Sequence, residues 1–160
     1  MIFRAFVFEP NEIVREFLLL VLKKRRYECF AFERAGICAM DLEAGWGSPA
    51  GRPCADIIIA DVNKHGFPDF EILGHVDQGN CKVPNIALMS GSWLDVHRSW
   101  AENLDCKIFE KPFRASTLNL WLDECEKRID PNRKLYNGSW ADSRGNGNPW
   151  NFNNCFFWGL

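Results

Sequence analysis

The sequence predicts an α/β domain built on a parallel, doubly wound sheet with helices on both faces. Short apolar stretches alternate with longer amphipathic stretches five times between residues 3 and 129. The strongest strand, 55–61, contains three consecutive isoleucines without polar alternation, which is typical of a strand buried on both faces. Strands that alternate with helices form parallel sheets, and right-handed crossovers place the helices on both sides.

The elements are expected in the following order. A strand at 3–8 precedes a helix at 11–24, which Asn11 can cap and which ends in four basic residues. A second strand at 27–32 and a helix at 33–43 lead into a loop at 45–53 that is rich in glycine and proline. The strand at 55–61 is followed by a helix near 69–76. The remaining elements are a strand at 84–90, a helix at 92–103, a strand at 106–109 and a helix at 115–129.

Length and composition describe one ordinary globular domain of 160 residues, with 47% hydrophobic and 25% charged residues. The formal charge of -2 gives no basic excess of the kind that nucleic-acid-binding domains carry. The longest aliphatic run, 17–22, is far shorter than the roughly 20 residues that span a bilayer. Glu9 and Glu12 interrupt the apolar start before a signal peptide could form. We therefore expect a cytoplasmic protein without nucleic-acid or membrane partners. We also expect its seven cysteines to be reduced and mostly buried, with a disulfide or a reactive thiol at Cys155 as the alternative for that one residue.

The composition changes near Pro131, which places the domain at 1–130 and a tail at 131–160. The tail contains seven asparagines, four glycines, three tryptophans and three phenylalanines, with no helical or strand period. One interpretation is a disordered extension. The other, favoured by the aromatic content, is that residues 135–160 dock onto this domain or onto a second copy, because soluble proteins seldom leave large apolar patches uncovered.

Four polar residues come at the predicted strand ends, where open parallel sheets place their functional sites. The first strand ends at Glu9, the third at Asp61, the fourth at Ser90, and the fifth runs into Lys111. A carboxylate can act as a nucleophile toward phosphorus. A metal ion and a lysine can neutralise the charge of a transferring phosphoryl group, and a hydroxyl can hydrogen-bond to the new group.

Several segments in this order resemble one known family. They are Phe6-Val7-Phe8-Glu9, Asp56-Ile57-Ile58-Ile59-Ala60-Asp61, Gly66, Pro84 to Gly91, and Lys111-Pro112-Phe113. Over residues 3–129 the chain resembles a response-regulator receiver domain of the chemotaxis type. The resemblance implies the (βα)5 flavodoxin-like fold with a five-stranded parallel sheet.

The resemblance also implies a role for each residue in a two-component phosphorelay. Asp61 would accept a phosphoryl group from a histidine kinase or a phosphotransfer protein, and Ser90 and Lys111 would contact that group. Mg²⁺ would be held by Glu9, Asp61 and the backbone carbonyl of Asn63. The Lys111-Pro112 peptide bond would be cis. Such a domain signals through protein contacts and is not an enzyme.

Three departures from the family pattern bear on this expectation. Pro10 stands where the family usually has a second acid, which predicts weaker Mg²⁺ binding because one oxygen ligand is lost. His65 replaces a common proline, and Ile108 stands at the position of an aromatic switch. The alternative function is a pseudo-receiver that acts as a phosphorylation-independent interaction module. An aspartate-nucleophile phosphohydrolase is disfavoured, because Asn63 stands where those enzymes have a second acid.

Three tryptophans define a candidate interaction surface. Trp93 and Trp100 are seven residues apart on one predicted helix, and Trp121 lies on the last helix. Tryptophan is enriched at interaction hot spots, although the same rings would also suit a core. The resemblance implies a partner or homodimer face formed by 92–103, 106–109 and 115–129, and the tail is a second candidate for homodimer contacts.

Overall fold

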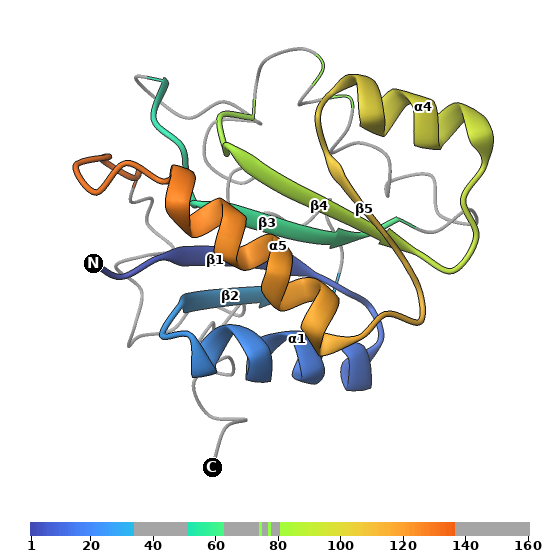
Figure 1. Cartoon of the computed structure of the whole chain (residues 1–160), viewed down its shortest axis with the longest axis horizontal. Helices are drawn as coiled ribbons and strands as arrows, with labels where there is room; N and C mark the ends of the chain where they lie inside the picture. The colour runs from blue at the N-terminus through green and yellow to red at the C-terminus, as the bar shows by residue number, and fades with distance from the viewer. Residues whose placement is uncertain (34–50, 63–73, 75–76, 78–80, 137–160) are drawn as a thin grey trace, which may run out of the picture.

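The computed structural model describes residues 1–33, 51–62, 74, 77 and 81–136. The elements are β1 (Arg4–Phe8), α1 (Glu12–Lys24), β2 (Glu28–Phe32), β3 (Ile57–Asp61), β4 (Asn85–Ser90), α4 (Asp95–Asn103), β5 (Lys107–Glu110) and α5 (Ala115–Arg128) (Figure 1). The five strands pair in parallel in the order β2-β1-β3-β4-β5. The predicted five-stranded parallel sheet is confirmed, whereas the helices expected at 33–43 and near 69–76 lie outside the described residues.

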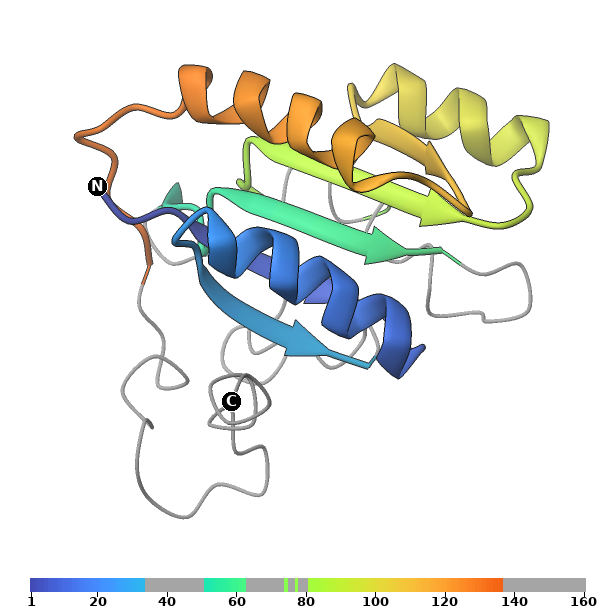
Figure 2. The same ribbon diagram turned by 60° about the horizontal axis from the view of Figure 1, so that its bottom comes forward.

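Helices cover both faces of the sheet. α1 and α5 lie side by side on one face, and α4 packs on the other (Figures 1 and 2). In β3 the side chains of Ile57 and Ile59 join the core under α1 and α5, while Ile58 joins the core on the opposite face. The strand is therefore buried on both faces, as its unbroken apolar run predicts.

The first helix forms for local reasons that the sequence already contains. The side chain of Asn11 accepts a hydrogen bond from the backbone N–H of Val14 at 3.1 Å, which caps the helix. Leu18 and Leu22 are fully buried against the sheet. At the other end Arg25 pairs with Asp123 and Glu126 of α5, so the two helices on this face are also joined by charge.

Two elements in the second half differ slightly from expectation. α4 begins at Asp95 rather than at 92, and its N-cap residue Leu94 makes no side-chain capping bond. β5 lies one residue later than predicted, at Lys107–Glu110. Within β5, Phe109 joins the core under α5 and Ile108 packs against the opposite face, because successive side chains of a strand alternate.

The expectation that Trp121 forms part of an interaction surface is wrong. Its side chain is only 6% exposed and packs edge-to-face on Phe109, with ring centroids 5.8 Å apart. Leu118, Leu122 and Cys125 are buried on the same side of α5, so position 121 falls on the apolar stripe of the helix. Trp93 and Trp100 are half-buried against the core of the other face, and their role in protein contacts stays a prediction.

The described cysteines, at positions 29, 54, 81, 106 and 125, are all buried, and none of them is in a disulfide. In the part of the chain that the structure describes, every helix is too short or too polar to cross a membrane. After α5 the chain turns back, and the backbone N–H of Tyr136 donates to the carbonyl of Pro53 at 2.8 Å. Residues 137–160, on which most of the predicted docking rests, lie outside the described residues.

Candidate functional site

The carboxyl ends of four strands bring the predicted site residues to one edge of the sheet. Glu9 directly follows β1, Asp61 ends β3, Ser90 ends β4 and Lys111 directly follows β5. Because β1, β3, β4 and β5 are consecutive parallel neighbours, their last residues share the same edge. The structure thus places all four residues where the sequence predicted a site.

Lys111 joins two of the strand ends by charge. Its Nζ lies 2.7 Å from Oε2 of Glu9 and 2.7 Å from Oδ1 of Asp61. Burial opposes the charge on the ammonium, but the hydrogen bonds to Asp61 and Glu9 outweigh it, so the pKa of Lys111 is raised. At neutral pH the ammonium therefore stays charged, and two carboxylates share one cation.

Glu9 is held more tightly than a solvated carboxylate at a strand end would be. Its side chain is 0% exposed. Oε1 accepts a hydrogen bond from the backbone N–H of Asn11 at 2.9 Å, while Oε2 faces Lys111. The Arg15 guanidinium donates to the backbone carbonyl of Glu9 at 2.8 Å. Both carboxylate oxygens are thus engaged within the protein.

Ser90 is buried, and its hydroxyl bonds within its own loop. The hydroxyl donates to the carbonyl of Ser92 at 3.2 Å and accepts from the N–H of Ser92 at 3.1 Å. The backbone N–H of Lys111 donates to the carbonyl of Ser90 at 2.9 Å, which ties the ends of β4 and β5 together. The Lys111-Pro112 peptide bond is cis.

The described residues fit Mg²⁺ only weakly. They contain no cluster of three or more His, Cys, Asp or Glu side chains able to hold a metal ion. Pro10 offers no side-chain oxygen, and both oxygens of the buried Glu9 carboxylate already accept a hydrogen bond, from Asn11 and from Lys111, so an ion would compete with these contacts. Asp61 remains as a carboxylate ligand, whereas Asn63, like His65, lies outside the described residues.

One feature of the site was not predictable from the sequence pattern. The resemblance assigned Lys111 to the acceptor carboxylate and Glu9 to the metal, but the structure pairs Lys111 with both acids. The sequence showed only that an acid, Glu9, and a lysine, Lys111, come at the ends of two predicted strands. Which strands are neighbours, and how far a lysine reaches across them, is decided by the sheet order.

Solved structures of receiver domains share this fold. A chemotaxis protein CheY4 of Vibrio cholerae gives a TM-score of 0.60 at 18% identity, covering 78% of this chain and 99% of that one. A response regulator from Thermotoga maritima gives 0.61 at 13% identity, covering 79% and 99%. The signal receiver domain of a putative Luxo repressor protein from Vibrio parahaemolyticus gives 0.62 at 15% identity, covering 80% and 92%.

Neither a protein-family model nor a curated protein matches the sequence. The likeness to solved structures, at identities of 10–20%, therefore establishes the fold. The flavodoxin-like receiver fold expected from the motifs, with its five-stranded parallel sheet, is confirmed.

Proposed function

We propose that the chain is a receiver domain of a two-component phosphorelay, in which Asp61 accepts a phosphoryl group from a histidine kinase or a phosphotransfer protein. The observation that carries the proposal is the contact between Asp61 and Lys111 at the carboxyl edge of a receiver-type sheet. A carboxylate acceptor beside a charged ammonium is the arrangement that transfer of an anionic group requires.

The transfer uses these side chains in a defined way. A carboxylate oxygen of Asp61 attacks phosphorus, the bond from phosphorus to the donor breaks, and the donor leaves with the electron pair. The product is an acyl phosphate on Asp61. Lys111 supplies positive charge to the phosphoryl oxygens, and the hydroxyl of Ser90 exchanges its bond to Ser92 for one to the new group.

Mg²⁺ is proposed as a weakly bound cofactor. When bound, it supplies positive charge to the phosphoryl oxygens. Asp61 and the backbone carbonyl of Asn63 would hold it, together with Glu9, for which the ion would compete with Lys111 and the backbone N–H of Asn11. The absence of a carboxylate at Pro10 is the reason to expect low affinity.

The proposed setting is the cytoplasm, and the proposed output is protein contact without an enzymatic reaction of the domain's own. The face that includes α4 and β5 is a candidate for partner or homodimer contacts. Leu94 and Val96, at the start of α4, are exposed there, while Trp93 and Trp100 lie half-buried beside them.

Intact-mass spectrometry after treatment with an acyl phosphate and Mg²⁺ tests the proposal. We expect one added phosphoryl group on the wild type and none on Asp61→Ala. Asp95→Ala is a matched control, because it removes an exposed carboxylate from the start of α4 and should be labelled normally. An unlabelled wild type, or equal labelling of Asp61→Ala, would contradict the proposal and favour the pseudo-receiver alternative.

A further inference from the structure

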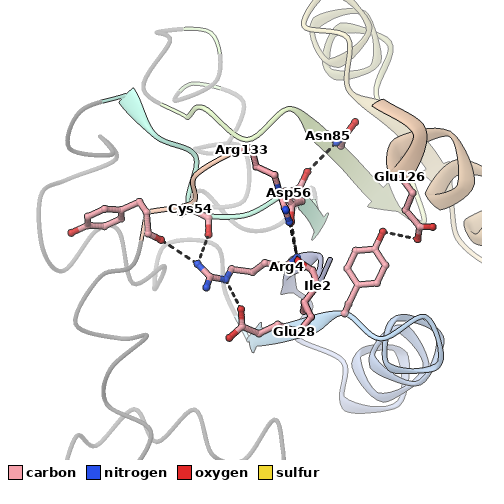
Figure 3. Close-up of polar contacts among 10 residues, drawn as sticks. Ile2, Arg4, Glu28, Cys54, Asp56, Asn85, Glu126 and Arg133 are labelled. Carbon is pink, nitrogen blue, oxygen red and sulfur yellow. Dashed lines mark hydrogen bonds and ion pairs between the residues drawn. The ribbon is translucent and has the colours of Figure 1, made fainter. Parts of the chain in front are cut away.

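A second polar cluster lies at the opposite end of the sheet, where the strands begin (Figure 3). We call it the amino-edge network. Its side chains are those of Arg4, Glu28, Asp56, Asn85, Arg128 and Arg133. Three of its members, Arg4, Asp56 and Asn85, are at least nine-tenths buried, which is unusual for polar residues. Their polar atoms therefore need hydrogen-bond partners within the protein.

Asp56 is the centre of the network. Asp56 is only 1% exposed, so its carboxylate is almost completely shielded from water. Arg133 binds the carboxylate with both arms of its guanidinium, Nε to Oδ1 at 2.7 Å and Nη2 to Oδ2 at 2.6 Å. The backbone N–H of Arg4 donates to Oδ2 at 2.8 Å. A bidentate pair of this kind fixes angle as well as distance, so residue 133 is joined firmly to the start of β1 and to the residue that precedes β3.

Arg4 makes a second attachment to the segment that contains Arg133, through the carbonyl of Tyr136. Its Nε donates to Glu28 at 2.7 Å, and its Nη1 donates to the carbonyls of Cys54 at 3.3 Å and Tyr136 at 3.1 Å (Figure 3). The backbone of Tyr136 also bonds to Pro53. Residues 130–136, which we call the strap, are therefore attached to the sheet at two separate points.

Asn85 extends the network to the fourth strand. Its side-chain Nδ2 donates to the backbone carbonyl of Asp56 at 3.0 Å. Arg128, the last residue of α5, donates to Oδ1 of Asn85 at 3.1 Å. The network thus connects the starts of β1, β3 and β4 with the end of α5, where the strap begins.

The same three strands carry the candidate site at their other ends. Glu9, Asp61 and Ser90 each come five residues after a network residue, following Arg4, Asp56 and Asn85 respectively. Five residues of strand span about 16 Å at roughly 3.3 Å per residue. β1, β3 and β4 are packed on both faces, and close-packed interiors transmit strain rather than absorb it.

We propose that the strap positions the candidate site, and that Arg133 does so by fixing the starts of β1 and β3 through Asp56. Without Arg133 the buried carboxylate of Asp56 loses its only described charged partner, and such a group must gain water or move. The start of β3 then shifts relative to β1 and β4, and Asp61 shifts relative to Glu9 and Ser90. Arg133 is thus a positioning residue, since it lies at the opposite end of the strands from the site.

The full-length Arg133→Ala variant tests this, with Lys134→Ala as the matched control. Lys134 is the exposed neighbouring cation, so its removal changes the charge without touching the network. We expect Arg133→Ala, but not Lys134→Ala, to shift the backbone amide NMR signals of Glu9, Asp61 and Ser90 at a temperature where circular dichroism shows both variants folded. Labelling by acyl phosphate should slow by about 2- to 30-fold, the range that typical coupling energies between distant sites produce.

The double variant Asp56→Ala/Arg133→Ala keeps the test decisive if the single variant does not fold, because it leaves no unpaired buried charge. It should fold, and still show shifted site signals and slow labelling. Site signals and labelling equal to those of Lys134→Ala, in whichever variant folds, would overturn the inference and leave the network a stabilising role alone. The labelling arm rests on the proposed function, whereas the amide signals do not. An unlabelled wild type would therefore refute the proposed function while the NMR comparison still decides the role of the strap.

Discussion

Replacing Lys111 with alanine should destabilise the folded domain strongly at neutral pH. The ammonium is the cation that Glu9 and Asp61 share, and those carboxylates are buried, with exposed side-chain fractions of 0% and 8%. Removing one partner of a buried ion pair costs about 3–5 kcal/mol. Because Lys111 itself is 23% exposed, water screens part of the effect, and we expect the lower end of that range, about 3 kcal/mol. For a chain of this size that corresponds to a fall in Tm of roughly 6–12 °C.

Thermal and urea unfolding at pH 7, followed by tryptophan fluorescence, measure the loss. Lys127→Ala is the control, since it removes an exposed lysine near the end of α5. Glu9→Gln/Lys111→Ala should recover part of the stability, because it neutralises one of the two buried carboxylates that lose their cation. If Lys111→Ala were as stable as Lys127→Ala, or if the added Glu9→Gln recovered nothing, the shared-cation reasoning would be refuted.

The stability difference between the wild type and Lys111→Ala should decrease only at alkaline pH. The pKa of Lys111 is raised in the folded protein, so its contribution is fully present below the ordinary lysine pKa of about 10.4. That contribution is lost as the pH rises through the raised value. The stability difference between the wild type and Lys111→Ala should therefore be constant from about pH 7 to pH 9 and narrow only above about pH 10.4. A difference that disappears between pH 7 and 9 would contradict the assignment.

Three further outcomes are expected. Pro10→Asp should strengthen Mg²⁺ binding, measured by titration of tryptophan fluorescence, because it adds a carboxylate next to Glu9 at the carboxyl end of β1; an unchanged affinity would mean that position 10 is not at the metal. Truncation after Asp130 should lower Tm because it removes Arg133 from its buried partner, whereas truncation after Tyr136 keeps those contacts, so a loss in the second case would instead support docking of the remaining tail. Cys106 should react slowly with iodoacetamide at pH 8 in the native state and rapidly in urea, because burial raises its pKa to about 11; rapid native labelling would contradict its buried position.

Much of the fold was predictable because it depends on local patterns. The unbroken run Ile57 to Ile59 identified a strand buried on both faces, and Asn11 identified the start of α1. The polar residues at strand ends followed from the same interpretation, because Asp61 and Ser90 are the first polar residues after the apolar runs of β3 and β4. The error at Trp121 is also local in origin: the ring suits a surface or a core, and the helical stripe formed by Leu118, Leu122 and Cys125 decides between them.

The sequence by itself determined the α/β class, the succession of strands and helices along the chain, and the edge of the sheet at which Glu9, Asp61, Ser90 and Lys111 lie. These follow from backbone geometry and burial, which repeat with fixed periods along the chain. The tertiary structure alone decided that Lys111 is shared between two acids 102 and 50 positions away, and that Arg133 neutralises Asp56 across 77 positions. Such pairs produce no periodic pattern in the sequence, because the order of the strands in the sheet and the path of the chain between them decide which charged side chains lie close together. A buried carboxylate requires a cation nearby, but only the assembled sheet determines which cation lies within reach.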